Sequence, residues 1–162
     1  MKVRDVMVET PAYCANDMNL GTAVELLWIF NCGFLPVVDS EKKVIGVITD
    51  RDICVALGTR NRLPGEIAVG EVSSGKVYSC KPNDDIRAAL ATMSAQKVRR
   101  LPVVDADGKL LAILSLDDII LHAQGRDTSR PHDISSEDVM NTLKYVCAPY
   151  LPAVVQGKTA AA

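Results

Sequence analysis

The sequence predicts an α+β fold made of two tandem β-α-β-β-α repeats related by pseudo-two-fold symmetry, with a short C-terminal helix added. The first observation is that Leu-Pro-Val-Val-Asp at residues 35–39 returns at residues 101–105, 66 positions later. The second is that residues 45–53, a short apolar run followed by Thr-Asp-Arg-Asp-Ile, correspond to residues 111–119 with the same offset. The third is that helical and strand periods alternate within each copy. Two similar halves of this kind are expected to place paired ligand sites between them.

The first helix of each repeat is predicted by apolar residues at helical spacing. These residues are Leu20, Ala23, Val24 and Leu27 in the first copy and Ile86, Ala89, Leu90 and Met93 in the second. Asp17 and Asn83 lie just before the two runs and are also 66 positions apart. Because short polar side chains accept hydrogen bonds from the free N–H groups of a helix start, we expect these two residues to cap the helices.

A β-hairpin and a second helix follow in each copy. Two β-rich runs flank a polar turn, at residues 35–39 and 44–48 in the first copy and at residues 101–105 and 110–114 in the second. The second helix begins at Asp50 or Leu116. We expect it to end near Gly58 or Gly125, because glycine readily adopts the left-handed conformation that ends many helices.

These elements assign residues 1–66 to the first repeat and residues 67–125 to the second. We expect a linker at residues 126–134, an additional helix at residues 135–148 and a partly disordered tail at residues 149–162. Ser135 or Ser136 can cap the additional helix, whose apolar face is formed by Val139, Met140, Leu143, Val146 and Cys147. That face fits either packing on its own protomer or covering a dimer partner, since an apolar stripe does not identify what it contacts.

Length and composition argue against several classes of protein. The 162 residues are 48% hydrophobic and carry a formal net charge of -2, with lysines and arginines spread along the chain. This composition is typical of a globular chain with an ordered core. The lack of a basic stripe argues against nucleic acid as the partner, and no apolar run reaches the roughly 18 residues of a membrane span. We expect a cytoplasmic protein without a membrane partner.

The five cysteines and two histidines form no recognisable metal or redox motif. The chain has no Cys-x-x-Cys pair, and we expect reduced, buried thiols. Cys14 and Cys80 occupy equivalent repeat positions, which predicts one core position for both. His122 and His132 have no second cluster of ligands nearby and are expected at the surface. No metal site is predicted.

Each repeat has a Ser/Thr-x-x-Asp motif where its second strand meets its second helix, formed by Thr49 with Asp52 and by Ser115 with Asp118. One interpretation is a capping box, in which the hydroxyl and the carboxylate bind free N–H groups at the helix start. The other is a ligand site, because a helix N-terminus attracts phosphate and an Asp in its first turn can accept hydrogen bonds from ribose hydroxyls. The presence of two equivalent copies favours the ligand site.

At these residues the chain resembles the CBS-domain pair, also called a Bateman module. The resemblance rests on residues 3–7 (Val-Arg-Asp-Val-Met), on both Leu-Pro-Val-Val-Asp segments and on residues 46–52 (Gly-Val-Ile-Thr-Asp-Arg-Asp), and it covers about residues 1–124. It implies a homodimeric regulatory module that binds AMP, ADP or ATP, or alternatively S-adenosylmethionine or a dinucleotide, in two clefts between the repeats. The sequence contains no effector motif, so we expect a stand-alone module whose regulated partner is a separate, unknown protein.

The resemblance also implies roles for the motif residues. Asp52 and Asp118 would hold ribose hydroxyls, and Thr49 and Ser115 would contact phosphate or ribose. We name the two sites after their repeats, so that the first cleft contains Thr49, Arg51 and Asp52 and the second cleft contains Ser115 and Asp118. The loop at Thr10, with Pro11 after it, would line the first cleft.

Further site residues lie around the two Leu-Pro pairs, whose backbone would frame the adenine. These residues are Phe34, Pro36, Val37, Arg100 and Pro102. Arg99 and Arg100 fit either a basic phosphate contact or a solvated pair, since long basic side chains readily extend into water.

The two copies differ beside the motif. Arg51 in the first copy corresponds to Asp117 in the second, and Gly46 corresponds to Ala112. A guanidinium attracts phosphate through charge-assisted hydrogen bonds, whereas a carboxylate repels it unless a cation such as Mg²⁺ intervenes. Alanine also leaves less room than glycine for close backbone approach. We therefore expect the first cleft to be the primary nucleotide site and the second to be weaker, empty or suited to a less charged ligand.

The sequence favours binding over catalysis. It lacks a nucleophile elbow, a Gly-rich phosphate loop with its lysine, and any assignable pair of base and nucleophile, so we expect no enzyme. No obligatory cofactor is expected, and an adenine nucleotide is the regulatory ligand. The alternative is a protein-interaction or dimerisation module whose clefts stay empty, because a fold resemblance alone does not show that a site is used.

Overall fold

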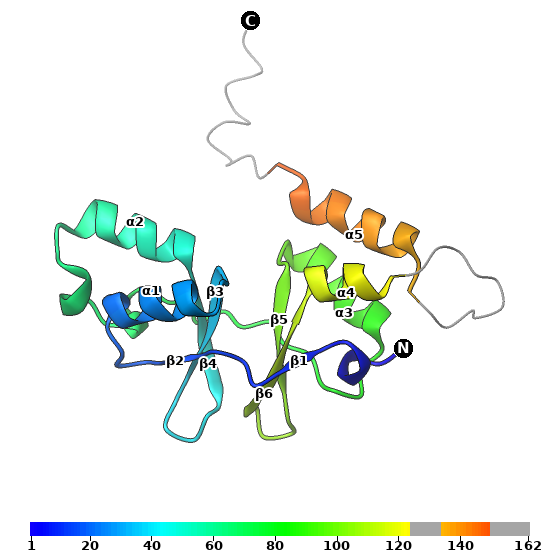
Figure 1. The fold of residues 1–162 in the computed structure, drawn as a ribbon, viewed down its shortest axis with the longest axis horizontal. Coiled ribbons are helices and arrows are strands. Elements are labelled where there is room, and N and C mark those ends of the chain that lie inside the picture. Colours follow the sequence, from blue (N-terminus) through cyan, green and yellow to red (C-terminus); the bar gives the residue numbers. More distant parts are fainter. Residues whose placement is uncertain (124–133, 150–162) are drawn as a thin grey trace, which may run out of the picture.

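Two central β-hairpins, one in each half, organise the molecule (Figure 1). The computed structural model describes residues 1–123 and 134–149. In the first half, helices α1 (Leu20–Ile29) and α2 (Asp50–Arg60) accompany strands β2 (Cys14–Ala15), β3 (Phe34–Val38) and β4 (Val44–Thr49). In the second half, helices α3 (Ile86–Gln96), α4 (Leu116–His122) and α5 (Ser136–Cys147) accompany strands β5 (Arg100–Val104) and β6 (Leu110–Ser115). The predicted α+β repeat architecture is confirmed.

The two hairpins are built alike down to their turns. β3 pairs antiparallel with β4 and β5 with β6, and both hairpins have a register shift at the corresponding position. Asp39 stabilises the first turn by accepting hydrogen bonds from the N–H groups of Glu41 and Lys43, both at 2.9 Å. Lys42 and Gly108 occupy equivalent turn positions with φ values of 63° and 83°. This left-handed backbone is easily adopted by glycine and is uncommon for lysine.

The β-hairpin of each repeat also pairs with a short segment from near the start of the other repeat. Strand β1 (Val8–Glu9) pairs antiparallel with β6 of the second repeat, where Val8 is the register partner of Ile113. The reciprocal contact joins Ser74, which lies 66 positions after Val8, to Val47 of β4 through backbone hydrogen bonds of 3.0 and 2.9 Å. The sequence analysis did not predict this exchange, because strand patterning does not say which sheet a short segment will join.

Two hydrophobic cores follow from the exchange. Val3 and Val6 pack into the core of the second repeat, together with Leu101. Ile67 and Val69 pack into the core of the first repeat. The packing therefore crosses the predicted boundary at residue 66 in both directions.

The predicted caps and ends of the helices differ from those in the structure. The residues that cap α1 and α3 are Asn19 and Asp85, which accept hydrogen bonds from backbone N–H groups at 3.0 and 2.8 Å, instead of Asp17 and Asn83. Helix α2 continues past Gly58 to Arg60, and the residue with left-handed backbone after it is Asn61, at φ 48°. Helix α4 ends at His122, and Gly125 lies outside the described residues.

The additional helix α5 begins after Ser135, as predicted, and packs on its own protomer. Val139 and Thr142 are 5% and 6% exposed and face the second repeat, whereas Met140 is 54% exposed. Ile134, just before the helix, is also buried in the second core. The predicted linker and tail, with His132, lie outside the described residues except at residues 134 and 149.

The five cysteines differ in exposure, and Cys32 is partly buried. Cys14 and Cys80 are buried in the two cores, as their repeat positions predict. Burial raises the pKa of the Cys14 thiol to about 11 and that of Cys80 to about 12. Cys54 and Cys147 are exposed, contrary to the expectation of buried thiols.

Alkylation of the native protein at pH 8 should modify Cys147 and spare Cys14 and Cys80. The thiolate is the reactive species, and burial both removes the thiolate and blocks the reagent. Mass spectrometry after brief iodoacetamide treatment measures the modification, with a denatured sample as control. Equal labelling of Cys80 and Cys147 in the native protein would contradict the two-core packing.

Helix length bears on membrane association. Among the described residues, no helix combines the length and the apolar character needed to cross a bilayer.

Candidate functional site between the repeats

Both Ser/Thr-x-x-Asp motifs form complete capping boxes. Thr49 donates from its N and its Oγ1 to Oδ2 of Asp52 at 2.9 and 2.7 Å, and the N of Asp52 donates back to Thr49 Oγ1 at 3.2 Å. Ser115 and Asp118 repeat this arrangement, with N···O distances of 3.1 Å in both directions and a contact between the Ser115 hydroxyl and Oδ2 of Asp118. The capping interpretation is therefore correct for both motifs.

A third box shows that this geometry does not by itself identify a ligand site. Ser135 and Asp138 form the same reciprocal bonds at the start of α5, outside the repeats. In Asp52 and Asp118 the capping box uses only one carboxylate oxygen, Oδ2. The other oxygen, Oδ1, accepts no hydrogen bond from the described residues. An ionised carboxylate can accept several hydrogen bonds, so capping and ligand binding are compatible at each aspartate.

Strand alternation decides which predicted residues face the space between the repeats. Val37 is fully buried in the first core, so its side chain is not available to a ligand. Successive strand residues point to opposite faces, which places Phe34 and Pro36 on the other face of β3 and Arg100 and Pro102 on the corresponding face of β5.

These faces border a cavity of about 190 Å³, which we call the inter-repeat cavity. Its lining comes from both hairpins, from the turn just before β5 and from the segment at residues 74–78, and consists of Phe34, Val47, Ser74, Lys76, Tyr78, Val98, Arg100 and Pro102. Phe34 is the register partner of Thr49, and Arg100 is the register partner of Ser115. Both capping boxes therefore begin directly beside residues that line the cavity, although neither box lines it.

Two cationic side chains give the inter-repeat cavity a positive character. The Lys76 ammonium lies 5.3 Å from the centre of the Tyr78 ring, within the range of a cation–π contact. The neighbouring Tyr78 side chain raises the pKa of Lys76, which favours the charged ammonium. Arg100 is partly exposed and lies 3.4 Å from the Asp117 carboxylate, which is mostly in solvent. Such an exposed ion pair is weak and leaves the guanidinium able to exchange partners.

Three other predicted site residues lie elsewhere. Arg99 turns toward α5, where its Nη2 donates to the sulfur of Cys147 at 3.6 Å, so the structure separates it from Arg100. Thr10 lines a different cavity of about 280 Å³ near the hairpin turns, together with Lys42. Arg51 is exposed at the start of α2.

The difference between Gly46 and Ala112 has a packing cause. A Cβ atom on Gly46 would lie 3.1 Å from the carbonyl oxygen of Ser74 and 3.3 Å from the Ser73 hydroxyl. The backbone that approaches Gly46 therefore belongs to the same chain, at residues 73–74. Ala112 pairs instead with Glu9 of β1, where its methyl group is accommodated.

Sequence reasoning missed five of the residues that line the cavity, Val47, Ser74, Lys76, Tyr78 and Val98. A signal for Lys76 was available, because Lys76 follows Thr10 by 66 positions and Thr10 is assigned to a cleft. Applying the repeat to that assignment would have placed the Lys76 segment at a cleft as well.

The described residues contain no group of three or more His, Cys, Asp or Glu side chains that could hold a metal ion. The acidic residues near the inter-repeat cavity are engaged in capping or in the pair with Arg100.

Sequence comparison finds the CBS domain model matching this chain twice, over residues 3–59 and 69–125. Inosine-5'-monophosphate dehydrogenase of Methanocaldococcus jannaschii is 32% identical over 118 residues, which are 73% of this chain and 22% of the dehydrogenase. CBS domain-containing protein YhcV of Bacillus subtilis is 30% identical over 127 residues, covering 78% of this chain and 89% of YhcV. The chain thus spans about a fifth of the enzyme and most of the smaller protein.

Structural comparison finds similar CBS-domain pairs. The CBS domain pair of protein MJ0100, in complex with 5'-methylthioadenosine and S-adenosyl-L-methionine, matches with a TM-score of 0.66 at 25% identity, covering 74% of this chain and 96% of that one. CBSX2 in complex with AMP matches with a TM-score of 0.65 at 26% identity, covering 74% and 93%. Because the family model matches both halves and the fold is that of known pairs, this chain belongs to the CBS-domain family and contains a pair of CBS domains.

Proposed function

We propose that this CBS-domain pair is a regulatory module that binds an adenosine-containing ligand, AMP, ADP or ATP, between its repeats and signals to a separate protein. The observation that carries the proposal is the inter-repeat cavity, where two cationic and two aromatic side chains converge. The structural relatives support the ligand class, because AMP, 5'-methylthioadenosine and S-adenosyl-L-methionine all contain an adenosine group.

Each part of a nucleotide has a matching group. The rings of Phe34 and Tyr78 offer apolar and stacking contacts to adenine. Lys76 and Arg100 offer charge-assisted hydrogen bonds to phosphate. The Oδ1 atom of Asp52, which takes no part in the capping box, can accept a hydrogen bond from a ribose hydroxyl next to the cavity.

The first cleft remains our choice for the primary site. Its Arg51 carries a positive charge beside Thr49 and Asp52, whereas the corresponding Asp117 places a carboxylate beside the second cleft and draws Arg100 to itself. A ligand in the second cleft would therefore carry less charge or bring Mg²⁺ with its phosphates.

Calorimetric titration with AMP and ATP tests the proposal and the ranking. Asp52→Ala should lower the affinity at least tenfold. A tenfold loss corresponds to about 1.4 kcal/mol of binding free energy, and the loss of one hydrogen bond to a charged group readily costs more than this. Asp118→Ala should have a smaller effect. Asp138→Ala is the control, because it removes the same kind of capping box from α5, away from the cavity. If Asp118→Ala abolishes binding and Asp52→Ala leaves it intact, the ranking is wrong.

Ligand binding would act on the partner by shifting an equilibrium. A nucleotide that contacts both repeats stabilises one relative arrangement of the two hairpins, and a partner that prefers this arrangement binds more tightly. In this proposal the module is a cytoplasmic homodimer, performs no catalysis and needs no obligatory cofactor.

The alternative function is an interaction module with empty clefts. Thermal melting separates the two, because a ligand that binds only the folded state raises stability by RT ln(1 + [L]/Kd). We expect a higher melting temperature with millimolar AMP or ATP. A shift with S-adenosylmethionine alone would assign that ligand instead, and unchanged melting with every adenosine compound would favour the empty-cleft module.

A further inference from the structure

The second repeat contains an ion pair that has no counterpart in the first. Nη2 of Arg100, the first residue of β5, lies 3.4 Å from Oδ2 of Asp117 in the first turn of α4. The equivalent residues 66 positions earlier are Phe34 and Arg51, which cannot form such a pair. The cation of the second repeat therefore lies on the strand, whereas the cation of the first repeat lies at the start of the helix.

Its place on the strand brings Arg100 to both clefts. The Arg100 side chain lines the inter-repeat cavity, whose described lining includes Lys76 as the other cation and contains no carboxylate. The ion-pair partner of Arg100 lies outside this lining, next to the capping box of Ser115 and Asp118 in the second cleft. Because the Asp117 side chain is 73% exposed, the pair is weak enough for a stronger partner to replace it.

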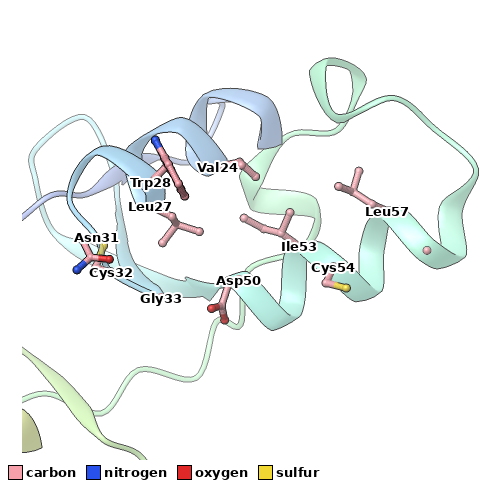
Figure 2. A pocket seen from close by; sticks show the side chains of 11 residues that line it. Val24, Leu27, Trp28, Asn31, Cys32, Gly33, Asp50, Ile53, Cys54 and Leu57 are labelled. Carbon is pink, nitrogen blue, oxygen red and sulfur yellow. The ribbon is translucent and has the colours of Figure 1, made fainter.

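A groove between α1 and α2 offers phosphate no comparable site (Figure 2). It lies on the helical side of the first repeat and has a volume of about 940 Å³, with the apolar side chains of Leu27 and Ile53 between the two helices. Asp50 is the only charged residue that lines it in the described chain. Since a carboxylate repels phosphate, the inter-repeat cavity is the better place for an anionic ligand.

We infer that Arg100 couples the two clefts by exchanging Asp117 for the phosphate of a nucleotide in the inter-repeat cavity. Without nucleotide, Arg100 neutralises Asp117 beside the second cleft. With nucleotide, the guanidinium binds the phosphate, and Asp117 is left as an unpaired carboxylate that repels a second anionic ligand. Coupling of binding free energies is reciprocal, so each nucleotide lowers the affinity for the other by the same factor. The inference rests on the proposed nucleotide site and adds antagonism between its two clefts.

Asp117→Asn tests the exchange, because it removes the competitor for Arg100 and keeps the size of the side chain. In calorimetric titrations of the whole chain, AMP should bind its tighter site about threefold to fivefold more strongly, the range expected from loss of an exposed ion pair. Adenosine has no phosphate, and its affinity should stay unchanged. In an Arg100→Ala background, Asp117→Asn should strengthen only the weaker AMP site. Equal gains for AMP and adenosine, or the same gain at the tighter site without Arg100, would overturn the inference.

Asp107→Asn is the matched control. Asp107 is an exposed carboxylate in the turn of the β5–β6 hairpin, and its replacement changes the net charge by the same amount. Both AMP affinities should stay within about twofold, as expected for an exposed charge outside the site. A gain equal to that of Asp117→Asn would overturn the inference, because net charge would then explain the effect. If AMP does not bind the wild type, the proposed function fails as well. If AMP binds and Asp117→Asn leaves its affinity unchanged, only the coupling through Arg100 is wrong.

Discussion

Val3→Asp is expected to unfold the second repeat, although Val3 lies at the beginning of the first. Val3 is fully buried in the second core, where the new carboxylate would have no cationic partner among the described core residues. Leaving a charge buried and unpaired costs about 3–5 kcal/mol, a large part of the roughly 5–15 kcal/mol that stabilises a typical domain. Urea unfolding followed by circular dichroism measures the loss, and hydrogen exchange locates it at α3 and β5.

Val8→Asp is the control for this variant. Val8 is in the same N-terminal segment but is 51% exposed, so its replacement should cost about 1 kcal/mol or less. Val69→Asp should reproduce the Val3 effect in the first core, because Val69 is the equivalent residue and is also fully buried. If Val3→Asp destabilised the first repeat and spared the second, the exchange of segments would be refuted.

Simultaneous Lys76→Ala and Arg100→Ala substitutions should weaken AMP binding by about a hundredfold. Hydrogen bonds to charged groups contribute about 1.5–3 kcal/mol each, and each 1.4 kcal/mol is a tenfold change in affinity. Calorimetry at low and physiological salt gives the measurement. The affinity of the wild type should fall as salt is added, whereas that of the double variant should change much less.

Arg99→Ala is the matched control for Arg100. The two arginines are adjacent in the sequence, but the side chain of Arg99 contacts α5 and that of Arg100 lines the inter-repeat cavity. Arg99→Ala should therefore leave the affinity for AMP within about twofold, as expected for an exposed charge outside the site. Equal losses in the two single variants would mean that phosphate binds outside the cavity.

The repeat made the elements predictable because their signals are local. Hairpin turns, apolar periodicity and the start of α2 at Asp50 are encoded within a few residues, and each signal occurs twice. Helix ends are less certain, since a polar residue two positions away can cap equally well, as Asn19 does in place of Asp17.

The exchange of segments could not be predicted in the same way. An offset of 66 positions aligns Val3 with Val69 whichever core each residue enters. The repeat therefore does not indicate whether each residue packs into the core of its own repeat or of the other. The inter-repeat cavity depends on this exchange, because it brings the Lys76 segment beside β4. The capping boxes were found from sequence, but Ser135 shows that the same pattern also occurs where no cleft is expected.

A crystal structure of the protein grown with AMP tests the central claim most directly. The account predicts AMP density in the inter-repeat cavity, with phosphate at Lys76 and Arg100, adenine against Phe34 or Tyr78, and ribose near Asp52. AMP bound in the separate cavity at Thr10 and Lys42, or no density at millimolar AMP in crystals with an open inter-repeat cavity, would contradict it.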